Sequence, residues 1–356
     1  MPSRTPLYAA QAAAGGKMVD FAGWDMAVQF AGIQAEHAAV RTAAGMFDVS
    51  HMGRLRVTGP GSTAFLSRLV CRKISDMKAG QVRYGMVLAD DGTVEDDILV
   101  SREADHQFHV VVNAGNREKI LGLWRPETSA AVILQDLSQE QAMIAVQGPR
   151  ACALLAGLGL DPAPLRIYSF RDVAWRGVTV RVSRTGYTGE DGGELFLPAE
   201  RAAEMWDALL AAGVKPCGLG CRDTLRLEAA MPLYGHELDR TVTPVEAGLT
   251  FAIDPQGSYR GADALRAQLA GGPPRKLVGL RMREKRVPRQ GYSVLHGGAK
   301  VGVITSGTLS PTLGDAIGLA YVPSALAATG SELAVDVRGQ VVPAVVVALP
   351  FYKRPR

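Results

Sequence analysis

The chain has 356 residues, 47% of them hydrophobic and 21% charged, and its formal net charge at pH 7 is +4. A chain of this length and composition typically folds into a globular protein of two or three domains. Its apolar clusters are broken by Gly, Pro or charge, which excludes a membrane-spanning helix, and it lacks the Lys/Arg runs of a nucleic-acid-binding protein.

The N-terminal stretch MPSRTPLYAAQAAAGG lacks the apolar core and cleavage site of a secretory signal, so we expect a cytoplasmic protein. The cysteines form no CxxC pair and do not alternate with histidine, which argues against a zinc site and a disulfide framework. They are Cys71, Cys152, Cys217 and Cys221. His106 and His109 lie three apart in an expected strand, a spacing that does not bring two side chains together. No metal site is predicted.

The chain is expected to mix short strands with a few amphipathic helices. The expected helices lie at residues 33–45, 116–124, 198–213 and 222–231. Strands are expected at residues 82–89, 93–101 and 108–113. Gly45 is a candidate C-cap of the first helix, and Asp91-Gly92 is a strong hairpin turn between the first two strands. Because strands and helices do not alternate strictly, we predict an α+β protein rather than a doubly wound one.

A change of character falls at residues 270–276, AGGPPRK, where Gly-Gly-Pro-Pro ends a helix. Only short strands are expected after it, at residues 276–282, 300–307, 316–323, 332–337 and 341–349. We therefore place a domain boundary after residue 272. Residues 1–272 form the first region and residues 273–356 a small all-β module.

Acidic residues crowd the second hairpin strand, in VEDDILV from Val94 to Val100. Neighbouring side chains of a strand point to opposite faces, so Asp96 and Asp97 cannot share one solvated side. Calcium-loop spacing is absent. A carboxylate within a strand is unfavourable unless an edge, a partner or a ligand compensates it. The pattern alone favours an edge strand protected by charge, and a chemical role stays open.

Residues 47–55, FDVSHMGRL, join the first helix to a strand. His51 is a candidate general base there. A structured turn whose polar side chains bond the backbone is the better interpretation.

Residues 183–197, SRTGYTGEDGGELFL, place four glycines in a loop between two strands. Such glycines permit positive φ and close approach of the backbone to a ligand. The loop has neither a phosphate-binding GK[ST] nor a dinucleotide fingerprint. Glu194 begins the following strand, either as a strand-edge charge or as an acceptor for two N–H groups of a flat heterocycle.

Arg222 is expected to open the helix at residues 222–231, where the helix dipole disfavours a cation. Arg226 lies on the same face, four residues later. A salt bridge from Arg222 to Asp223 or Glu228 is the simpler interpretation, and the alternative is that Arg222 holds an anionic ligand.

Several of these motifs together resemble one family, the aminomethyltransferases, which are the tetrahydrofolate-dependent T-proteins of the glycine cleavage system. The motifs are KMVDFAGWDMAVQF, RTAAGMFDVSHMGR, DGTVEDDILV, VVVNAGNREK, AVQGP, RTGYTGEDGGEL, KPCGLGCRDTLRLEAAMPLYGHEL, TPVEAGL and ITSGTLSPTLGDAIGLAYVP. The resemblance runs from about residue 5 to residue 351.

The resemblance implies a three-domain ring, with two interleaved α+β folate-binding domains and a C-terminal β-barrel-like domain. The implied reaction moves an aminomethyl carbon from a lipoylated carrier protein to tetrahydrofolate, releases ammonia and forms 5,10-methylenetetrahydrofolate, without a metal. Two alternatives share the fold. One is a folate-dependent demethylase acting on a free methylated compound, and the other is a non-catalytic folate-binding factor.

The same resemblance implies roles for individual residues. Asp97 matches the catalytic carboxylate, Glu194 the residue that holds the pterin ring, and Arg222 a folate-binding arginine. Residues in motifs that line the folate pocket are Met52, Tyr84, Asn113 and Tyr187. Tyr352 and Arg354 lie in a C-terminal tail that resembles one reaching back toward the ligand.

Four positions depart from the family pattern: Ala27, Phe30, Glu95 and Ala230. Ala27 stands where Pro is usual, Phe30 where Tyr is common and Ala230 where Gly is usual, and all three are interpreted as packing changes. Glu95 replaces an apolar residue and adds a charge on the face of Asp97, which would disfavour the ionised form of Asp97.

Overall fold

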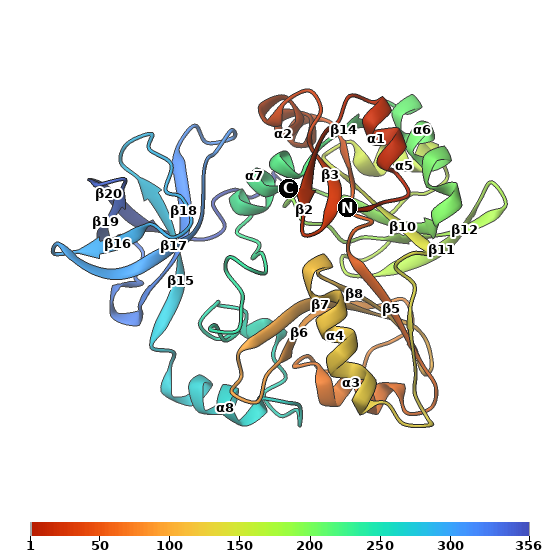
Figure 1. The fold of residues 1–356 in the computed structure, drawn as a ribbon, viewed down its shortest axis with the longest axis horizontal. Coiled ribbons are helices and arrows are strands. Elements are labelled where there is room, and N and C mark those ends of the chain that lie inside the picture. Colours follow the sequence, from red (N-terminus) through yellow and green to blue (C-terminus); the bar gives the residue numbers. More distant parts are fainter. Residues whose placement is uncertain (1, 356) are drawn as a thin grey trace. The chain divides into compact units, whose positions relative to one another are not determined.

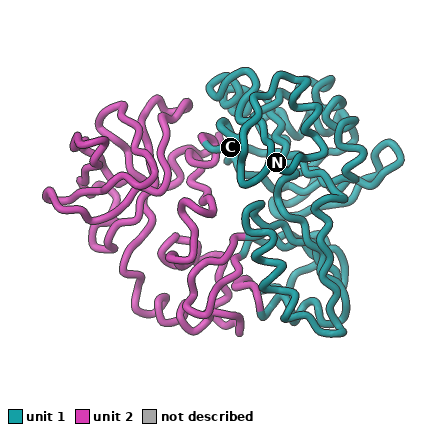
Figure 2. Tube along the Cα trace, in the orientation of Figure 1, with its two compact units in different colours: residues 1–68, 73–85, 98–223 teal, residues 69–72, 86–97, 224–356 magenta. Residues whose placement is uncertain are grey.

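The computed structural model describes residues 2–355 of the chain. These residues divide into two compact units, distinguished by colour in Figure 2. Of the described residues, unit 1 comprises 2–68, 73–85 and 98–223, and unit 2 comprises 69–72, 86–97 and 224–355. The predicted boundary after residue 272 lies inside unit 2 and stays a prediction.

The first sheet of unit 1 has six strands in the order β11-β12-β13-β10-β4-β14. Their bounds are β4 Gly45–Asp48, β10 Gln141–Gln147, β11 Phe170–Trp175, β12 Val178–Ser183, β13 Gly192–Pro198 and β14 Lys215–Pro216. Alternate residues of β10 and β13, among them Ile144 and Leu195, are fully buried in one apolar cluster. That cluster includes residues of helices α5 (Ala151–Gly157) and α6 (Ala202–Ala211), so these helices cover one face and leave the other for polar residues such as Glu194.

The second sheet has five strands in the order β6-β7-β8-β5-β9, and Figure 1 labels its β5, β6, β7 and β8. Their bounds are β5 Gly53–Thr58, β6 Val82–Leu88, β7 Val94–Ala104, β8 Gln107–Val112 and β9 Ile133–Asp136. The hairpin predicted at Asp91-Gly92 is confirmed, because the backbone N–H of Ala89 donates to the carbonyl of Thr93 and Gly92 has φ +80°.

The edge-strand interpretation of the acidic strand is wrong for β7 as a whole, because β7 lies between β6 and β8. Its ladder with β8 begins only at Leu99, which pairs with Val111. The acidic residues therefore stand on the part of β7 that extends beyond the end of that ladder. This part of β7 has no ladder partner on β8 and is an edge on that side, but Glu95 and Asp96 are buried there rather than solvated.

The chain alternates between the two sheets: β4 belongs to the first, β5 to β9 belong to the second, and β10 to β14 return to the first. A third, small sheet has the order β1-β3-β2, with β1 Ser3–Arg4, β2 Lys17–Phe21 and β3 Trp24–Gln29. This alternation supports the predicted interleaving of two subdomains, which stays a prediction.

The predicted helices form, but several of their ends differ. The remaining bounds are α1 Tyr8–Ala13, α2 Ile33–Thr42, α3 Ser62–Leu69, α4 Arg117–Trp124, α7 Leu219–Glu228 and α8 Ala262–Gly271. The α2 helix ends at Thr42, and Gly45 begins β4 rather than capping the helix. A Cβ at Gly45 would lie 2.5 Å from Val40 Cγ2 and 2.6 Å from Cys217 Sγ, so close packing explains the glycine.

Two further helix starts were wrong. The α6 helix begins at Ala202 after a short 3₁₀ turn, and Pro198 is the last residue of β13. The α7 helix begins at Leu219, so Arg222 is its fourth residue and does not open it.

The departures from the family pattern fall into two kinds. Ala27 is buried and the Phe30 ring lies 6.2 Å from that of Trp206, which agrees with packing changes. Ala230 follows α7 with φ +54°, in the left-handed region that favours glycine. Packing alone therefore does not account for Ala230.

In unit 2, residues 275–347 form a closed barrel in the order β15-β18-β17-β16-β19-β20 (Figure 1). The strands are β15 Arg275–Met282, β16 Ser293–His296, β17 Ala299–Leu309, β18 Ala316–Pro323, β19 Glu332–Val337 and β20 Gln340–Val347. The α+β class and the C-terminal barrel are confirmed. The sequence reasoning missed β16, a strand of only four residues. No helix among residues 2–355 is long and apolar enough to cross a membrane.

His109 on β8 ties the two larger sheets of unit 1 together. Its Nε2 lies 3.1 Å from Gln141 Oε1 on β10, and its ring meets that of Phe196 on β13 edge-on at 5.2 Å. Burial, reinforced by the charge of Arg181, lowers the pKa of His109 to about 4. The folded state therefore keeps this imidazole neutral at neutral pH.

The first prediction follows from this pKa. Because the pKa is lower in the folded than in the unfolded chain, the unfolded state binds more protons below pH 6.5, and stability falls as pH falls from there toward 4. We expect His109 to remove about 1.4 kcal/mol of unfolding free energy between pH 7.5 and pH 5.5. His109→Gln keeps a hydrogen-bond partner for Gln141. Over the same pH interval its unfolding free energy, measured by urea denaturation, should fall by about 1.4 kcal/mol less than that of the unaltered protein. Equal losses in both proteins would contradict the assignment.

Candidate functional site

Glu194 stands on β13 with its side chain on the face opposite the apolar cluster that contains Leu195. It is 5% exposed, and it lies opposite Ala145 on β10 and Ser183 on β12. The Thr185 hydroxyl donates to Glu194 Oε2 at 2.5 Å. Burial raises the pKa of Glu194, against the lowering effects of the Thr185 hydrogen bond and the Arg222 charge. A buried carboxylate in this position can accept further N–H donors from a ligand.

The glycine-rich loop before β13 is held from two sides. Gln147 on β10 donates to the carbonyl of Thr185 at 3.2 Å and accepts from the Thr188 hydroxyl at 3.1 Å. Arg41 on α2 donates to the carbonyl of Thr188 and to Glu190, at 2.8 Å each. A Cβ at Gly186 would come within 2.0 Å of Gln147 Oε1, so this glycine permits packing of the loop onto β10.

Arg222 is placed by the start of α7. Gly218, which precedes the helix, donates its backbone N–H to Glu36 Oε2 at 2.8 Å. One turn later the Arg222 guanidinium lies over the Tyr187 ring, 4.5 Å from its centroid, a cation–π contact that joins α7 to the glycine-rich loop. Glu228, one of the two predicted salt-bridge partners, accepts hydrogen bonds from Ser310 and Thr312, and the predicted salt bridge of Arg222 stays a prediction.

His51 and Met52 lie in the predicted turn before β5. Ser50 donates its backbone N–H to Asp48 Oδ1 at 2.9 Å, which confirms the turn. Burial, with the charges of Arg222 and Arg54, lowers the pKa of His51 to about 3, so its imidazole is neutral. Gly53, the first residue of β5, pairs with Val112, the last residue of β8. Met52, just before β5, and Asn113, just after β8, therefore lie at neighbouring strand ends.

Tyr168 was missed by the sequence reasoning. It has φ +60° and is 42% exposed as a whole residue, while partial desolvation of its hydroxyl, together with the charge of Glu194, raises the pKa of that hydroxyl. A non-glycine residue with positive φ is a rare conformation that the surrounding structure must impose. No motif marks this tyrosine, so only the fold reveals its proximity to Glu194.

Asp97 belongs to unit 2, on β7, and is half-buried, whereas Asp96 is fully buried. The added charge of Glu95 forms an ion pair with Arg240. The Tyr234 hydroxyl donates to the carbonyl of Val94 at 3.3 Å, and burial and the charges of Asp96, Asp239 and Asp97 raise its pKa to about 12. Asp97 thus stands near a protonated phenol.

The remaining predicted residues are distributed between the units. Tyr84 is half-buried on β6 in unit 1. In unit 2, the backbone N–H of Tyr352 donates to the carbonyl of Glu228 at 2.8 Å, which holds the C-terminal tail against the end of α7. Arg354, two residues later, is half-buried.

One group of potential metal ligands exists among residues 2–355, namely Glu36, Cys217 and Cys221, all buried. Glu36 already accepts backbone N–H groups at the starts of two helices, where the positive end of each helix dipole disfavours a cation. We assign this group to helix capping and packing.

Comparison with known proteins agrees with this picture. A family model described as the GCVT N-terminal domain matches residues 7–257, and one described as the glycine cleavage T-protein C-terminal barrel domain matches residues 275–353. The chain is 47% identical to an aminomethyltransferase of Geobacillus kaustophilus (strain HTA426), over 99% of this chain and 100% of that protein. An aminomethyltransferase of Shouchella clausii (strain KSM-K16) is also 47% identical, with 99% and 98% coverage.

The crystal structure of glycine cleavage system aminomethyltransferase T from Bartonella henselae has a TM-score of 0.95 and 33% identity, and 99% of each chain is covered. Both family models are therefore matched in one chain. The chain belongs to the glycine cleavage T-protein family of aminomethyltransferases.

Proposed function

We propose that this aminomethyltransferase takes the aminomethyl carbon from the lipoyl arm of a carrier protein and delivers it to tetrahydrofolate. Ammonia leaves and 5,10-methylenetetrahydrofolate forms. The observation that carries the proposal is Glu194, a buried carboxylate beside Arg222 and Tyr187, in a chain that matches the family along its whole length. Tetrahydrofolate is the co-substrate, and the lipoylated carrier is the proposed partner in the cytoplasm.

Glu194 is proposed to hold the pterin ring. The pterin edge presents adjacent N–H donors, and a carboxylate can accept both as charge-assisted hydrogen bonds. Arg222, held over Tyr187, would meet carbonyl or anionic groups of the same ligand. Met52, Tyr84, Asn113 and Tyr187 are proposed to line the folate pocket, and Tyr352 and Arg354 to reach it from the tail.

Asp97 is proposed as the catalytic carboxylate. Ionised, it would orient N10 of the folate toward the aminomethyl carbon and stabilise the positive charge that develops as ammonia leaves. Its neighbour Glu95 carries a like charge on the same strand face, and the Arg240 ion pair balances that charge. Such a role is worth ~2–4 kcal/mol of barrier.

The two alternatives are separable in one assay. Ammonia release would be measured with tetrahydrofolate and aminomethylated lipoyl carrier, beside a panel of free methylated amines and sulfonium compounds. We expect ammonia release with the aminomethylated carrier and tetrahydrofolate, and none with the free methylated compounds. Turnover of a free methylated compound would indicate a demethylase, and folate binding without turnover of any substrate would indicate a binding factor. Full-length similarity to aminomethyltransferases favours the carrier-dependent reaction.

Asp97→Asn should reduce turnover in that assay at least a hundredfold, because the amide cannot stabilise the developing positive charge. Tetrahydrofolate affinity, measured by calorimetry, should stay nearly unchanged. Asp96→Asn serves as the comparison, since Asp96 points to the opposite face of β7. Near wild-type turnover in Asp97→Asn, together with a loss in Asp96→Asn, would mean that the other carboxylate is catalytic.

Glu194→Gln should weaken tetrahydrofolate binding more than tenfold, because it removes the charge and turns one acceptor into a donor. The charge-assisted hydrogen bonds it replaces contribute ~1.5–3 kcal/mol each. Glu200→Gln, at an exposed glutamate just after β13, is the matched control and should bind normally. Unchanged affinity in Glu194→Gln would show that the pterin is held elsewhere.

A further inference from the structure

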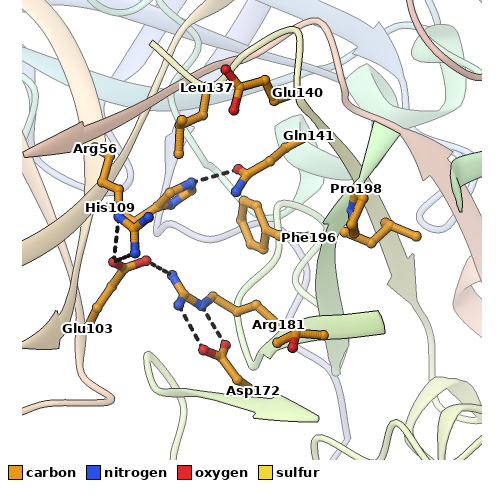
Figure 3. Close-up of a pocket in the computed structure, with 12 residues that line it drawn as sticks. Arg56, Glu103, His109, Leu137, Glu140, Gln141, Asp172, Arg181, Phe196 and Pro198 are labelled. Atoms are coloured by element: carbon orange, nitrogen blue, oxygen red, sulfur yellow. Dashed lines mark hydrogen bonds and ion pairs between the residues drawn. The ribbon is translucent and has the colours of Figure 1, made fainter. Parts of the chain in front are cut away.

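A second candidate binding site lies within unit 1, in a pocket of ≈ 310 Å³ between its two larger sheets (Figure 3). Arg56, Glu103 and His109 line it from the five-stranded sheet, and Arg181 and Phe196 line it from the six-stranded one. None of the residues proposed to bind folate lines this pocket. Its volume equals that of about ten water molecules, which suits a small organic ligand.

Part of the pocket wall is already satisfied by internal ion pairs, drawn as dashed lines in Figure 3. Glu103 accepts from Arg56 Nη2 at 3.0 Å and from Arg181 Nη1 at 2.6 Å. Arg181 also donates to Asp172 through Nε and Nη2, at 2.8 and 3.0 Å. This chain of alternating charges joins β7 to β12 and is a structural tether between the sheets.

Three polar groups of the same pocket are not used by that tether. Glu140 is exposed at the mouth of the pocket, and its carboxylate forms no hydrogen bond or ion pair with any of residues 2–355. Gln141 accepts from His109 through Oε1, and its amide nitrogen is left as a donor toward the pocket. Arg56 uses Nε and Nη2 on Glu103, so its Nη1 is also left as a donor.

The charges indicate what these groups would recognise. Two arginines and three acidic residues line the pocket, and two of the acidic residues are paired with the arginines, so Glu140 supplies one unbalanced negative charge. A carboxylate attracts an ammonium group, while the amide and guanidinium N–H groups attract a carboxylate. The apolar part of the wall comes from Leu137, Phe196 and Pro198 among others.

We propose that this pocket binds an α-amino acid with an apolar side chain. The ammonium group pairs with Glu140, the carboxylate accepts from Gln141 and Arg56, and the side chain lies against Phe196. Phe196 follows Glu194 by two residues on the same face of β13, so the bound amino acid lies about 7 Å along the strand from the proposed pterin carboxylate. The site is independent of the proposed catalytic reaction.

Calorimetry on the full chain with leucine tests the proposal. We expect leucine to bind at least tenfold more tightly than 3-methylbutylamine, which lacks the carboxylate, and than 4-methylpentanoate, which lacks the ammonium group. Glycine should bind more weakly than leucine, because each additional buried methylene improves affinity about fourfold. Binding should persist in the presence of saturating tetrahydrofolate.

Glu140→Gln should weaken leucine binding at least tenfold and leave tetrahydrofolate affinity unchanged. Gln139→Ala, the exposed neighbour outside the pocket, is the control and should bind leucine normally. The proposal is overturned by any of three results: no leucine binding at about 20 mM, equal affinity for either truncated analogue, or unchanged leucine affinity in Glu140→Gln. Because folate binding is measured separately, failure of this proposal is distinguishable from failure of the proposed function.

Discussion

The hydrogen bonds accepted by the Glu36 carboxylate are the interaction on which the proposed folate-binding side of unit 1 depends. Its Oε1 accepts the backbone N–H groups of Phe30 and Gly32 at the start of α2, at 2.6 and 3.0 Å, and its Oε2 accepts that of Gly218 before α7. A buried negative charge is stabilised there, because both helix N-termini present unpaired donors. Glu36 therefore fixes where α7 begins, and the position of Arg222 one turn later follows from it.

Two glycines near this carboxylate, Gly218 and Gly220, also determine where α7 begins. A Cβ at Gly218 would lie 2.3 Å from the carbonyl carbon of Val28, and one at Gly220 would lie 2.7 Å from Ile33 Cδ1. Only glycine lets α7 begin this close to β3 and α2. The G-x-G pattern in KPCGLGCRD, which resembles part of a nucleotide-binding fingerprint in sequence, is thus a packing feature that sets the height of Arg222 over Tyr187.

Features governed by local chemistry were predictable from the sequence, and those governed by tertiary contacts were not. The turn at Asp91-Gly92 and the barrel strands follow from turn preference and from alternation. The start of α7 depends on Glu36, far away in sequence, so no local pattern could place Arg222 correctly. The sequence favoured a helix cap at Gly45 because it does not show that Val40 and Cys217 leave no room for a Cβ at this position.

The buried glutamates also differ in how fully the protein satisfies them, and this difference separates a binding carboxylate from a structural one. Glu36 accepts three backbone N–H groups, and Glu237 is bonded by Arg226, by the Thr305 hydroxyl and by a backbone N–H. Glu194 accepts one hydrogen bond, from a hydroxyl, and burial consequently raises its pKa. Burying a carboxylate with so few hydrogen-bond donors destabilises the folded protein when no ligand is bound. The N–H donors of a pterin would supply what the protein leaves out, and so the least satisfied glutamate is the one best suited to hold the ligand.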